Sequence, residues 1–319
     1  MNKKIVVIGG GTGTFTVLSG LKNYPVDLTA VVSMADDGGS TGVLRDELGV
    51  LPPGDIRQCL VALATSDRLM RKLMNYRFSN GSLMGHTFGN IFLSTLEKLT
   101  GSFDEAVNKI SEILRLRGQV IPATLCQVKL VAYLTNGLVL RGQNIIYGSD
   151  LAKLKKIALE PKAEANPKAL RAIREADLVI IGPGDLYSSL IPNFLISGIS
   201  KALKKSRAKK LYICNLMNRA GQTENFHPDD YVNKIEEYSG ARLDNIIYNK
   251  ECPPQRLLSR YLNEGERLVP TAVIRNKRYL GDKLIGRKLA KSAKGDRLKR
   301  NLIRHNPDAL AKLIVDKFL

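Results

Sequence analysis

The sequence predicts an α/β protein with a Rossmann-like, mostly parallel, doubly wound sheet, and three observations support this prediction. Short runs of apolar, β-branched residues at 4–8 and 178–181 have the composition of buried parallel strands. Each run is followed by a glycine-containing turn and then by apolar residues at helical spacing. Strand and helix units of this kind alternate with short connections along the chain, which is typical of doubly wound sheets.

In the first half of the chain, helices are expected to outnumber strands. We expect strands at 4–8 and 27–32, a long polar loop at 33–42, and helices at 14–21, 55–64, 67–75, 87–99 and 103–116. The pattern then changes to strands at 127–134 and 138–140, separated by Asn136-Gly137, a dipeptide typical of hairpin turns. The sequence therefore predicts a small antiparallel or helical insertion, which would form a subdomain within 100–150.

The second half returns to alternating units. We expect strands at 156–159, 178–181, 211–214 and 245–248, and helices after Asn166-Pro167, at 188–203 and at 229–238. An apolar content of 44% is enough for one sizeable core. We therefore predict a single domain over 1–319, with a basic C-terminal segment at 270–319.

Charge is distributed unevenly along the chain. The net charge is +19, and most of it lies in residues 151–319, with dense basic stretches at 201–210 and 275–304. Such a surface attracts anions, so acidic proteins or other anions are candidate partners of the C-terminal segment. Basic residues interleaved with Leu and Ile also describe the solvated faces of ordinary helices. Nucleic acid is disfavoured as a partner, because only 6% of residues are aromatic and few bases could stack on them.

The N-terminus and the cysteines point to the cytoplasm. The first apolar run is too short for a secretion signal or a membrane span, so we expect a cytoplasmic protein without a span. The four cysteines lie far apart without a CxxC pair, which favours reduced thiols over a zinc site or disulfides. A homo-oligomer is compatible with the sequence.

Two glycine turns are the strongest candidates for ligand binding. The first contains Gly10, Gly11, Thr12, Gly13 and Thr14, and the second contains Gly182, Gly184 and Asp185. Turns without side chains let backbone N–H groups approach a phosphate at the start of a helix. Counted from Gly9, the dinucleotide fingerprint would need a glycine where Thr14 stands, which argues against an ordinary NAD site. A tight turn without a ligand is the alternative interpretation.

Polar loops supply further candidates. Asp36 and Asp37, followed by Ser40 and Thr41, suit a ribose hydroxyl or an Mg²⁺ ion that bridges a diphosphate, although solvated turn residues would look similar. Asp37 is the candidate Mg²⁺ ligand, and no cofactor is expected to be required.

Four side chains beyond these loops could complete the site, namely Arg57, His86, Asn90 and Arg219. Asp55 is expected to cap a helix, and Arg57 in its first turn either meets an anion or is solvated. His86 could contact a phosphate or cap a helix, and Asn90 could bind a base or hydroxyl. Arg219 follows a later strand and could join them, or lie on a plain surface loop. The sequence has no nucleophile elbow, Walker loop or HExxH helix.

Together these motifs resemble a known family. The segments at 9–13, 33–45, 51–63, 85–90, 181–193 and 219–223 are similar to those of the YvcK group, the gluconeogenesis factors, within the CofD-like superfamily. The resemblance implies a Rossmann-like sheet, binding of UDP-sugars such as UDP-N-acetylglucosamine, and a cytoplasmic role in cell shape and wall homeostasis during gluconeogenic growth. It also implies that Tyr261 stacks on a base and that Arg304 holds a phosphate.

Two hypotheses follow from the residues and the resemblance. The first is a regulatory protein that binds a nucleotide sugar without turning it over. The second is a CofD-like, Mg²⁺-dependent transferase of phospho groups that uses Asp36 and Asp37 on a nucleotide diphosphate substrate. The 36–42 loop and the segment after Leu51 look more like the YvcK style than the CofD pattern, which favours binding over catalysis. The basic tail from Arg275 onward departs from the family.

Overall fold

The computed structural model describes residues 2–270, 274–286 and 303–319, and seven parallel strands form its main sheet. The sheet has the order β10-β9-β8-β7-β1-β2-β3. The strands are β1 (Lys3–Gly9), β2 (Val26–Val32), β3 (Gln119–Pro122), β7 (Leu178–Ile181), β8 (Lys209–Ile213), β9 (Asn245–Asn249) and β10 (Tyr279–Asp282). The chain builds outward from β1 on one side and from β7 on the other, so the order reverses between these two neighbours. This confirms the predicted doubly wound sheet.

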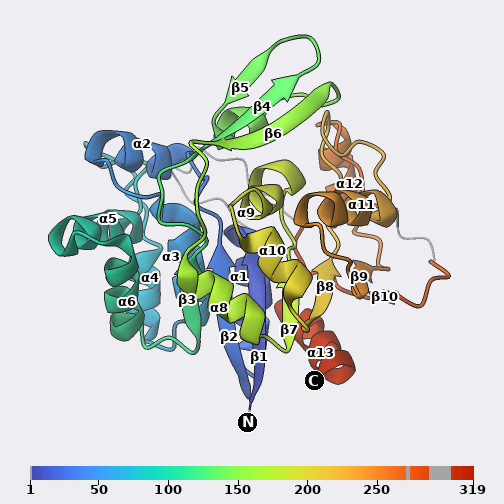
Figure 1. Ribbon diagram of the computed structural model, residues 1–319, viewed down its shortest axis with the longest axis horizontal. Helices are drawn as coiled ribbons and strands as arrows, with labels where there is room; N and C mark the ends of the chain where they lie inside the picture. The colour runs from blue at the N-terminus through green and yellow to red at the C-terminus, as the bar shows by residue number, and fades with distance from the viewer. Residues whose placement is uncertain (1, 271–273, 287–302) are drawn as a thin grey trace.

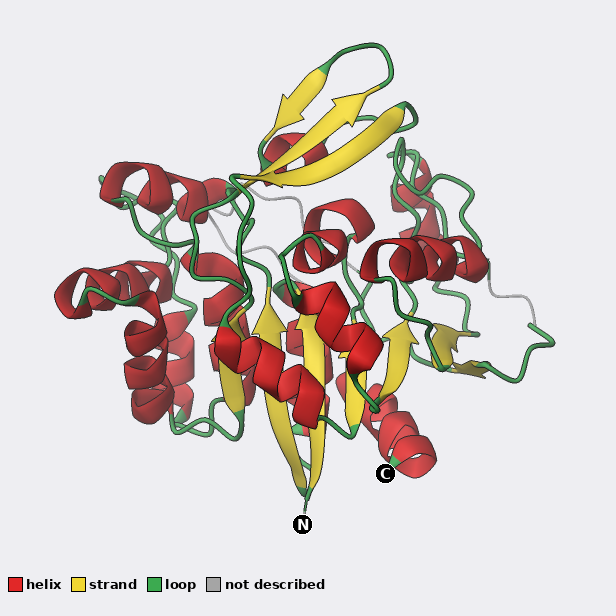
Figure 2. Ribbon diagram, in the orientation of Figure 1, coloured by secondary structure: helices red, strands yellow, loops and turns green. Residues whose placement is uncertain are grey.

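Helices cover both faces of this sheet (Figure 2). Alternate residues of β1 point to opposite faces, so Ile5 and Val7 pack in one apolar cluster and Val6 and Ile8 in the other. The first cluster includes residues of α1 (Thr12–Leu21), α3 (Pro53–Leu63), α5 (Phe88–Thr100), α6 (Phe103–Leu114) and α13 (Pro307–Phe318). The second includes residues of α8 (Pro167–Glu175), α9 (Ile191–Phe194), α10 (Ile199–Lys205) and α11 (Pro228–Ser239). Burial on both faces explains why the central strands are continuous apolar runs.

A second, antiparallel sheet lies beyond the carboxyl ends of the main strands, at the top of Figure 1. It consists of β4 (Lys129–Leu134), β5 (Val139–Arg141) and β6 (Leu154–Glu160), in the order β5-β4-β6, and the short helix α7 (Gln143–Tyr147) follows β5. The turn between β4 and β5 contains Gly137 at a φ of 87°, as the Asn-Gly signal predicts. Within 100–150, α6 and β3 belong to the main layers, whereas the antiparallel sheet continues to Glu160.

Three sequence-based predictions were wrong in detail. The loop at 33–42 is interrupted, because α2 (Gly39–Leu48) begins inside it; its glycine and polar residues gave no helical periodicity. The helix expected at 188–203 is divided into the π-helix η1 (Leu186–Leu190), α9 and α10, and Gly198 at a φ of 99° separates the last two. Asp55 is not an N-cap, because α3 starts two residues earlier at Pro53.

Two helices remain to be named, and the basic C-terminal segment lies partly outside the described residues. The remaining helices are α4 (Arg68–Met74) and α12 (Gln255–Leu262). The basic segment predicted at 270–319 falls partly on residues 271–273 and 287–302, which lie outside the described residues. Within the described residues, no helix is long and apolar enough to cross a membrane.

Candidate functional site

The two glycine turns meet at the carboxyl ends of β1 and β7, where a cavity of about 330 Å³ opens. Gly13 in the first turn of α1 packs directly on the second turn, since a Cβ atom at Gly13 would lie 1.7 Å from the carbonyl oxygen of Pro183. The turns are adjacent because β1 and β7 are hydrogen-bonded neighbours. Open α/β sheets bind ligands at such a point, where the strand order reverses.

Most of the predicted site residues line this cavity. They are Gly10, Gly11, Thr12, Gly13, Asp36, Ser40, Thr41, Arg57, His86, Asn90, Gly184, Asp185, Arg219 and Arg304. Residues from seven separate segments of the sequence therefore share one cavity.

Four predicted site residues do not line the cavity. Thr14 is fully buried in α1 next to Gly9, and Gly182 shapes the second turn at a φ of 66°. Tyr261 is buried, packs with Ile303, and its hydroxyl accepts a hydrogen bond from the backbone N–H of that residue at 3.0 Å. Tyr261 therefore supports the cavity wall at Ile303 rather than presenting a ring to the cavity. Asp37 is the fourth.

The adjacent carboxylates Asp36 and Asp37 have different surroundings. Asp36 lines the cavity, and its Oδ1 accepts a hydrogen bond from the N–H of Gly38 at 3.0 Å. The carboxylate of Asp37 instead accepts hydrogen bonds from the backbone N–H groups of Gln143 and Asn144, at 2.9 and 2.7 Å. The pair does not face the cavity together. Within the described part of the chain, no group of three or more His, Cys, Asp or Glu residues could hold a metal ion.

Arg57 anchors one wall of the cavity and is neither in a first turn nor solvated. Only 6% of it is exposed. Its Nε donates to Oδ1 of Asn90 at 2.8 Å, and its Nη1 donates to Oδ1 of Asn75 at 2.5 Å. These hydrogen bonds join α3 to α5 and to the end of α4, so the guanidinium is held in one orientation.

Hydroxyl and ring groups continue this wall. The amide of Asn90 donates to Oγ of Ser40 at 3.2 Å, and the same oxygen lies 3.1 Å from Nδ1 of His86. The side chain of Thr87, not of His86, caps α5 by accepting from the N–H of Asn90. The wall therefore presents a connected set of polar groups, suited to hydroxyl or phosphate oxygens.

Arg219 lines the cavity from the loop that follows β8. Its guanidinium carbon lies 3.5 Å from the ring centroid of Tyr147, and its Nε donates to the backbone oxygen of Tyr147 at 3.0 Å. Two carboxylates flank the guanidinium: Oδ2 of Asp185 lies 3.8 Å from its Nε, and Oε1 of the buried Glu266 lies 3.5 Å from its Nη1. Burial is the main cause of the raised pKa of Tyr147. Arg219 is thus oriented by three neighbours instead of lying on a plain surface loop.

His305 lines the cavity together with its neighbour in sequence, Arg304. Burial lowers its pKa to about 4, so its imidazole is neutral near pH 7. Its Nε2 has no hydrogen-bond partner among the described residues. The imidazole is therefore an uncharged, buried group near pH 7.

Comparison with known proteins places this architecture in a family. The model of the CofD family, described as 2-phospho-L-lactate transferase CofD, matches residues 5–288. The chain belongs to the CofD family. It is 39% identical over 318 residues to the gluconeogenesis factor of Bacillus subtilis. The aligned region covers 98% of this chain and 97% of that protein. This confirms the resemblance to the gluconeogenesis-factor branch of the family.

Two further comparisons agree with the same branch. The gluconeogenesis factor of Halalkalibacterium halodurans is 40% identical over 266 residues, or 82% of each chain. A crystal structure of a UPF0052 family member from Bacillus halodurans is 34% identical and superposes with a TM-score of 0.88, covering 99% of each chain. The CofD-family fold is therefore shared over nearly the whole length.

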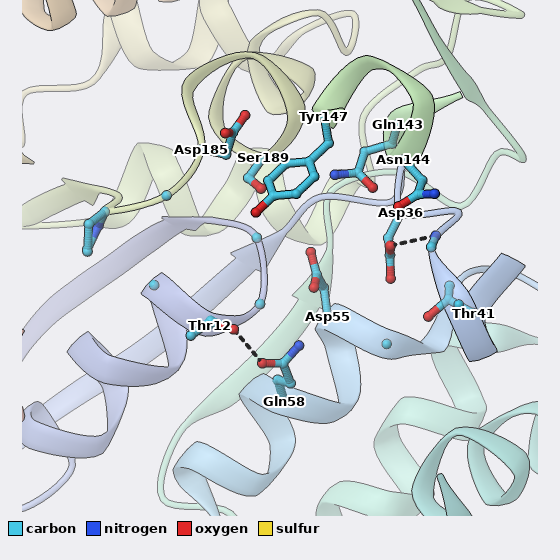
Figure 3. A pocket seen from close by; sticks show the side chains of 18 of the residues that line it. Thr12, Asp36, Thr41, Asp55, Gln58, Gln143, Asn144, Tyr147, Asp185 and Ser189 are labelled. Carbon is cyan, nitrogen blue, oxygen red and sulfur yellow. Dashed lines mark hydrogen bonds between the residues drawn. The ribbon is translucent and has the colours of Figure 1, made fainter. Parts of the chain in front are cut away.

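Sequence reasoning missed several side chains of this CofD-family cavity (Figure 3). Asp55 and Gln58 face the first glycine turn: a Cβ at Gly11 would lie 2.3 Å from Oδ1 of Asp55 and 2.4 Å from Nε2 of Gln58. Their spacing of three residues on a helix places them on one face, and this signal could have identified them. Gln143, Asn144 and Tyr147 enter from α7, and no local motif marks them.

Proposed function

We propose that this protein binds a nucleotide sugar, such as UDP-N-acetylglucosamine, in the cavity between the two glycine turns, without turning it over. In this proposal it is a regulator of cell shape and wall homeostasis during gluconeogenic growth. The cellular part rests on membership of a branch whose relatives are named gluconeogenesis factors. The binding part rests on one observation, the direct packing of Gly13 against Pro183.

This packing matters because it concentrates backbone N–H groups at one place. The first turn leads into the ten-residue helix α1, whose first N–H groups have no partner within the helix. A diphosphate placed there would accept hydrogen bonds from the turn at Gly10–Gly13 and gain from the positive end of the helix. The polar walls beyond the turns would then receive the base and the sugar.

Isothermal titration calorimetry with UDP-N-acetylglucosamine, UDP-glucose, UDP and NAD tests the proposal. We expect binding of the UDP compounds and no binding of NAD. Gly11→Val should abolish binding, because its side chain would displace Asp55 and Gln58 and fill the space beside the turn. Thermal unfolding of the variant checks that it is folded. Unchanged affinity in a folded Gly11→Val protein would refute the placement of the ligand.

A second candidate is a transferase of phospho groups, and it is favoured by the name of the matching family model and by the carboxylates in the cavity. Asp37 holds α7, and Asp185 and Glu266 flank Arg219, so Asp36 and Asp55 are the lining carboxylates that would contact an Mg²⁺-bound diphosphate in this proposal. Incubation of the protein with a UDP-sugar and Mg²⁺, followed by product analysis, separates the two functions. Turnover that is lost in Asp55→Asn would support catalysis, and intact ligand would support binding alone.

A further inference from the structure

The short helix α7 brings three polar or aromatic side chains to the cavity although it belongs to the antiparallel insertion. Gln143, Asn144 and Tyr147 all line the cavity, and Figure 3 shows the Tyr147 ring pointing down from α7 toward the level of Asp55. Five residues are too few for a helix that is stable by itself. Contacts with the core must therefore fix where these side chains lie.

Asp37 fixes the first end of α7. Each of its carboxylate oxygens accepts one backbone hydrogen bond, from Gln143 at 2.9 Å and from Asn144 at 2.7 Å. Its side chain is 11% exposed, and Nη1 of the buried Arg45 lies 4.0 Å away. The preceding residue, Gly142, has a φ of 110°, and a Cβ atom there would lie 2.7 Å from Oδ2 of Asp37. The chain therefore approaches this carboxylate as closely as a glycine allows.

Gln222 fixes the other end. Its buried Nε2 lies 2.8 Å from the backbone oxygen of Ile146, 3.1 Å from that of Tyr147 and 3.1 Å from that of Ser149. Arg219 adds its hydrogen bond to the Tyr147 oxygen and covers one face of the Tyr147 ring. Loops that follow β2 and β8 in the main sheet thus hold α7 from both ends.

Tyr147 is the one Phe, Tyr or Trp side chain among the described residues that line the cavity. A ring that is already stacked on a guanidinium on one face is a rigid platform for a second ring. The side-chain amides of Gln143 and Asn144 beside it can donate to and accept from hydroxyl or carbonyl groups. This set matches an uncharged ring that carries hydroxyl or amide groups.

We infer that α7 is the specificity element of the cavity. In this arrangement, which rests on the proposed function, Tyr147, Gln143 and Asn144 contact the uncharged ring next to the diphosphate. Asp37 and Gln222 are positioning residues that act through α7 and do not touch the ligand. The insertion, rather than the glycine turns, then decides which nucleotide sugar is accepted.

The positioning role is tested with two variants and two matched controls in calorimetry with UDP-N-acetylglucosamine. Asp37→Asn keeps the shape but leaves one acceptor oxygen, and Gly142→Ala forces α7 away from Asp37 without changing charge. We expect each to weaken binding about tenfold. Asp46→Asn removes an equal charge from an exposed partner of Arg45, and Gly137→Ala strains a glycine with no neighbour within 4 Å. Both controls should stay within twofold of the wild type.

The contact itself is tested with Tyr147→Ala, titrated with UDP-N-acetylglucosamine and with UDP. Loss of affinity for the sugar nucleotide alone assigns the sugar to α7, and equal loss for both ligands assigns the base. Unchanged affinity for both ligands overturns the inference while leaving the proposed function intact. A wild-type protein that binds neither ligand overturns both. A Tyr147→Ala protein that loses stability but keeps both affinities would show that α7 has a merely structural role, which would also overturn the inference.

Discussion

Replacing Gly13 with alanine tests whether the two glycine turns touch. The new Cβ atom would lie 1.7 Å from the carbonyl oxygen of Pro183, whereas ordinary contact begins at 3.4 Å. Since both partners are backbone atoms, no side-chain rotation can relieve the overlap, and the two turns must separate by more than an ångström. The cavity between them would change shape.

The cost can be worked out from two opposing effects. Alanine is favoured over glycine inside a helix by about 1 kcal/mol. Overpacking in a dense region costs about 1–3 kcal/mol and sometimes more, and this overlap is severe. We therefore expect Gly13→Ala to lower the free energy of unfolding by about 2 kcal/mol, which corresponds to a decrease in Tm of about 5 °C.

Gly20 supplies a matched control in the same helix. A Cβ atom there would lie 2.1 Å from the carbonyl oxygen of Pro307, next to α13 and away from the cavity. Both variants should therefore lose similar stability in urea unfolding, but only Gly13→Ala should lose affinity for UDP-N-acetylglucosamine. A Gly13→Ala protein that is as stable as the wild type would refute the contact, and one that is destabilised but binds normally would refute the placement of the ligand.

Three further predictions follow from buried and exposed groups. The pKa of His305 is about 4 in the folded protein and near its ordinary 6.5 in the unfolded chain, so the unfolded chain binds the proton first as pH decreases. The free energy of unfolding should therefore fall by about 3 kcal/mol between pH 6.5 and pH 4. Urea unfolding of His305→Gln should show a correspondingly smaller pH dependence. Arg57→Lys cannot keep the hydrogen bonds to both Asn75 and Asn90, and should lower the free energy of unfolding by about 2 kcal/mol in the same assay. A thiol reagent should label the exposed Cys126 and Cys252 rapidly, and the two buried cysteines only after unfolding, which mass spectrometry can resolve.

The sequence could predict the central sheet because its signals are local. The apolar run that becomes β1 is buried on both faces, and the glycines that follow it begin the turn into α1. The same signal recurs at β7, and the carboxyl ends of parallel strands lie at one edge of a sheet, so both turns lie at that edge; that β1 and β7 are direct neighbours is known only from the structure. The helix α2 escaped prediction because its polar and glycine-rich sequence has no apolar period, and of its three apolar side chains only Leu44 is buried.

The site was less predictable, for a physical reason that Asp36 and Asp37 illustrate. Adjacent side chains in an extended segment point to opposite sides, so two neighbouring carboxylates rarely face the same ligand. This alternation could have separated their roles, but not their partners. Asp37 binds backbone groups 106 and 107 residues later, and that contact exists only because the antiparallel insertion folds back over the sheet. No local pattern carries such information.

The charges of the cavity show where its selectivity must come from. The described residues that line it include as many carboxylates as guanidinium groups, namely Asp36, Asp55, Asp185 and Glu266 against Arg57, Arg77, Arg219 and Arg304. The net charge of +19 is therefore not concentrated in the cavity. The electric field of this net positive charge can raise the rate at which any anion or acidic protein arrives. Such a field acts on all anions alike and does not distinguish one nucleotide sugar from another. Every nucleotide sugar carries the diphosphate that the main-chain amides of the two turns would bind, so discrimination must depend on the directional side chains of α7.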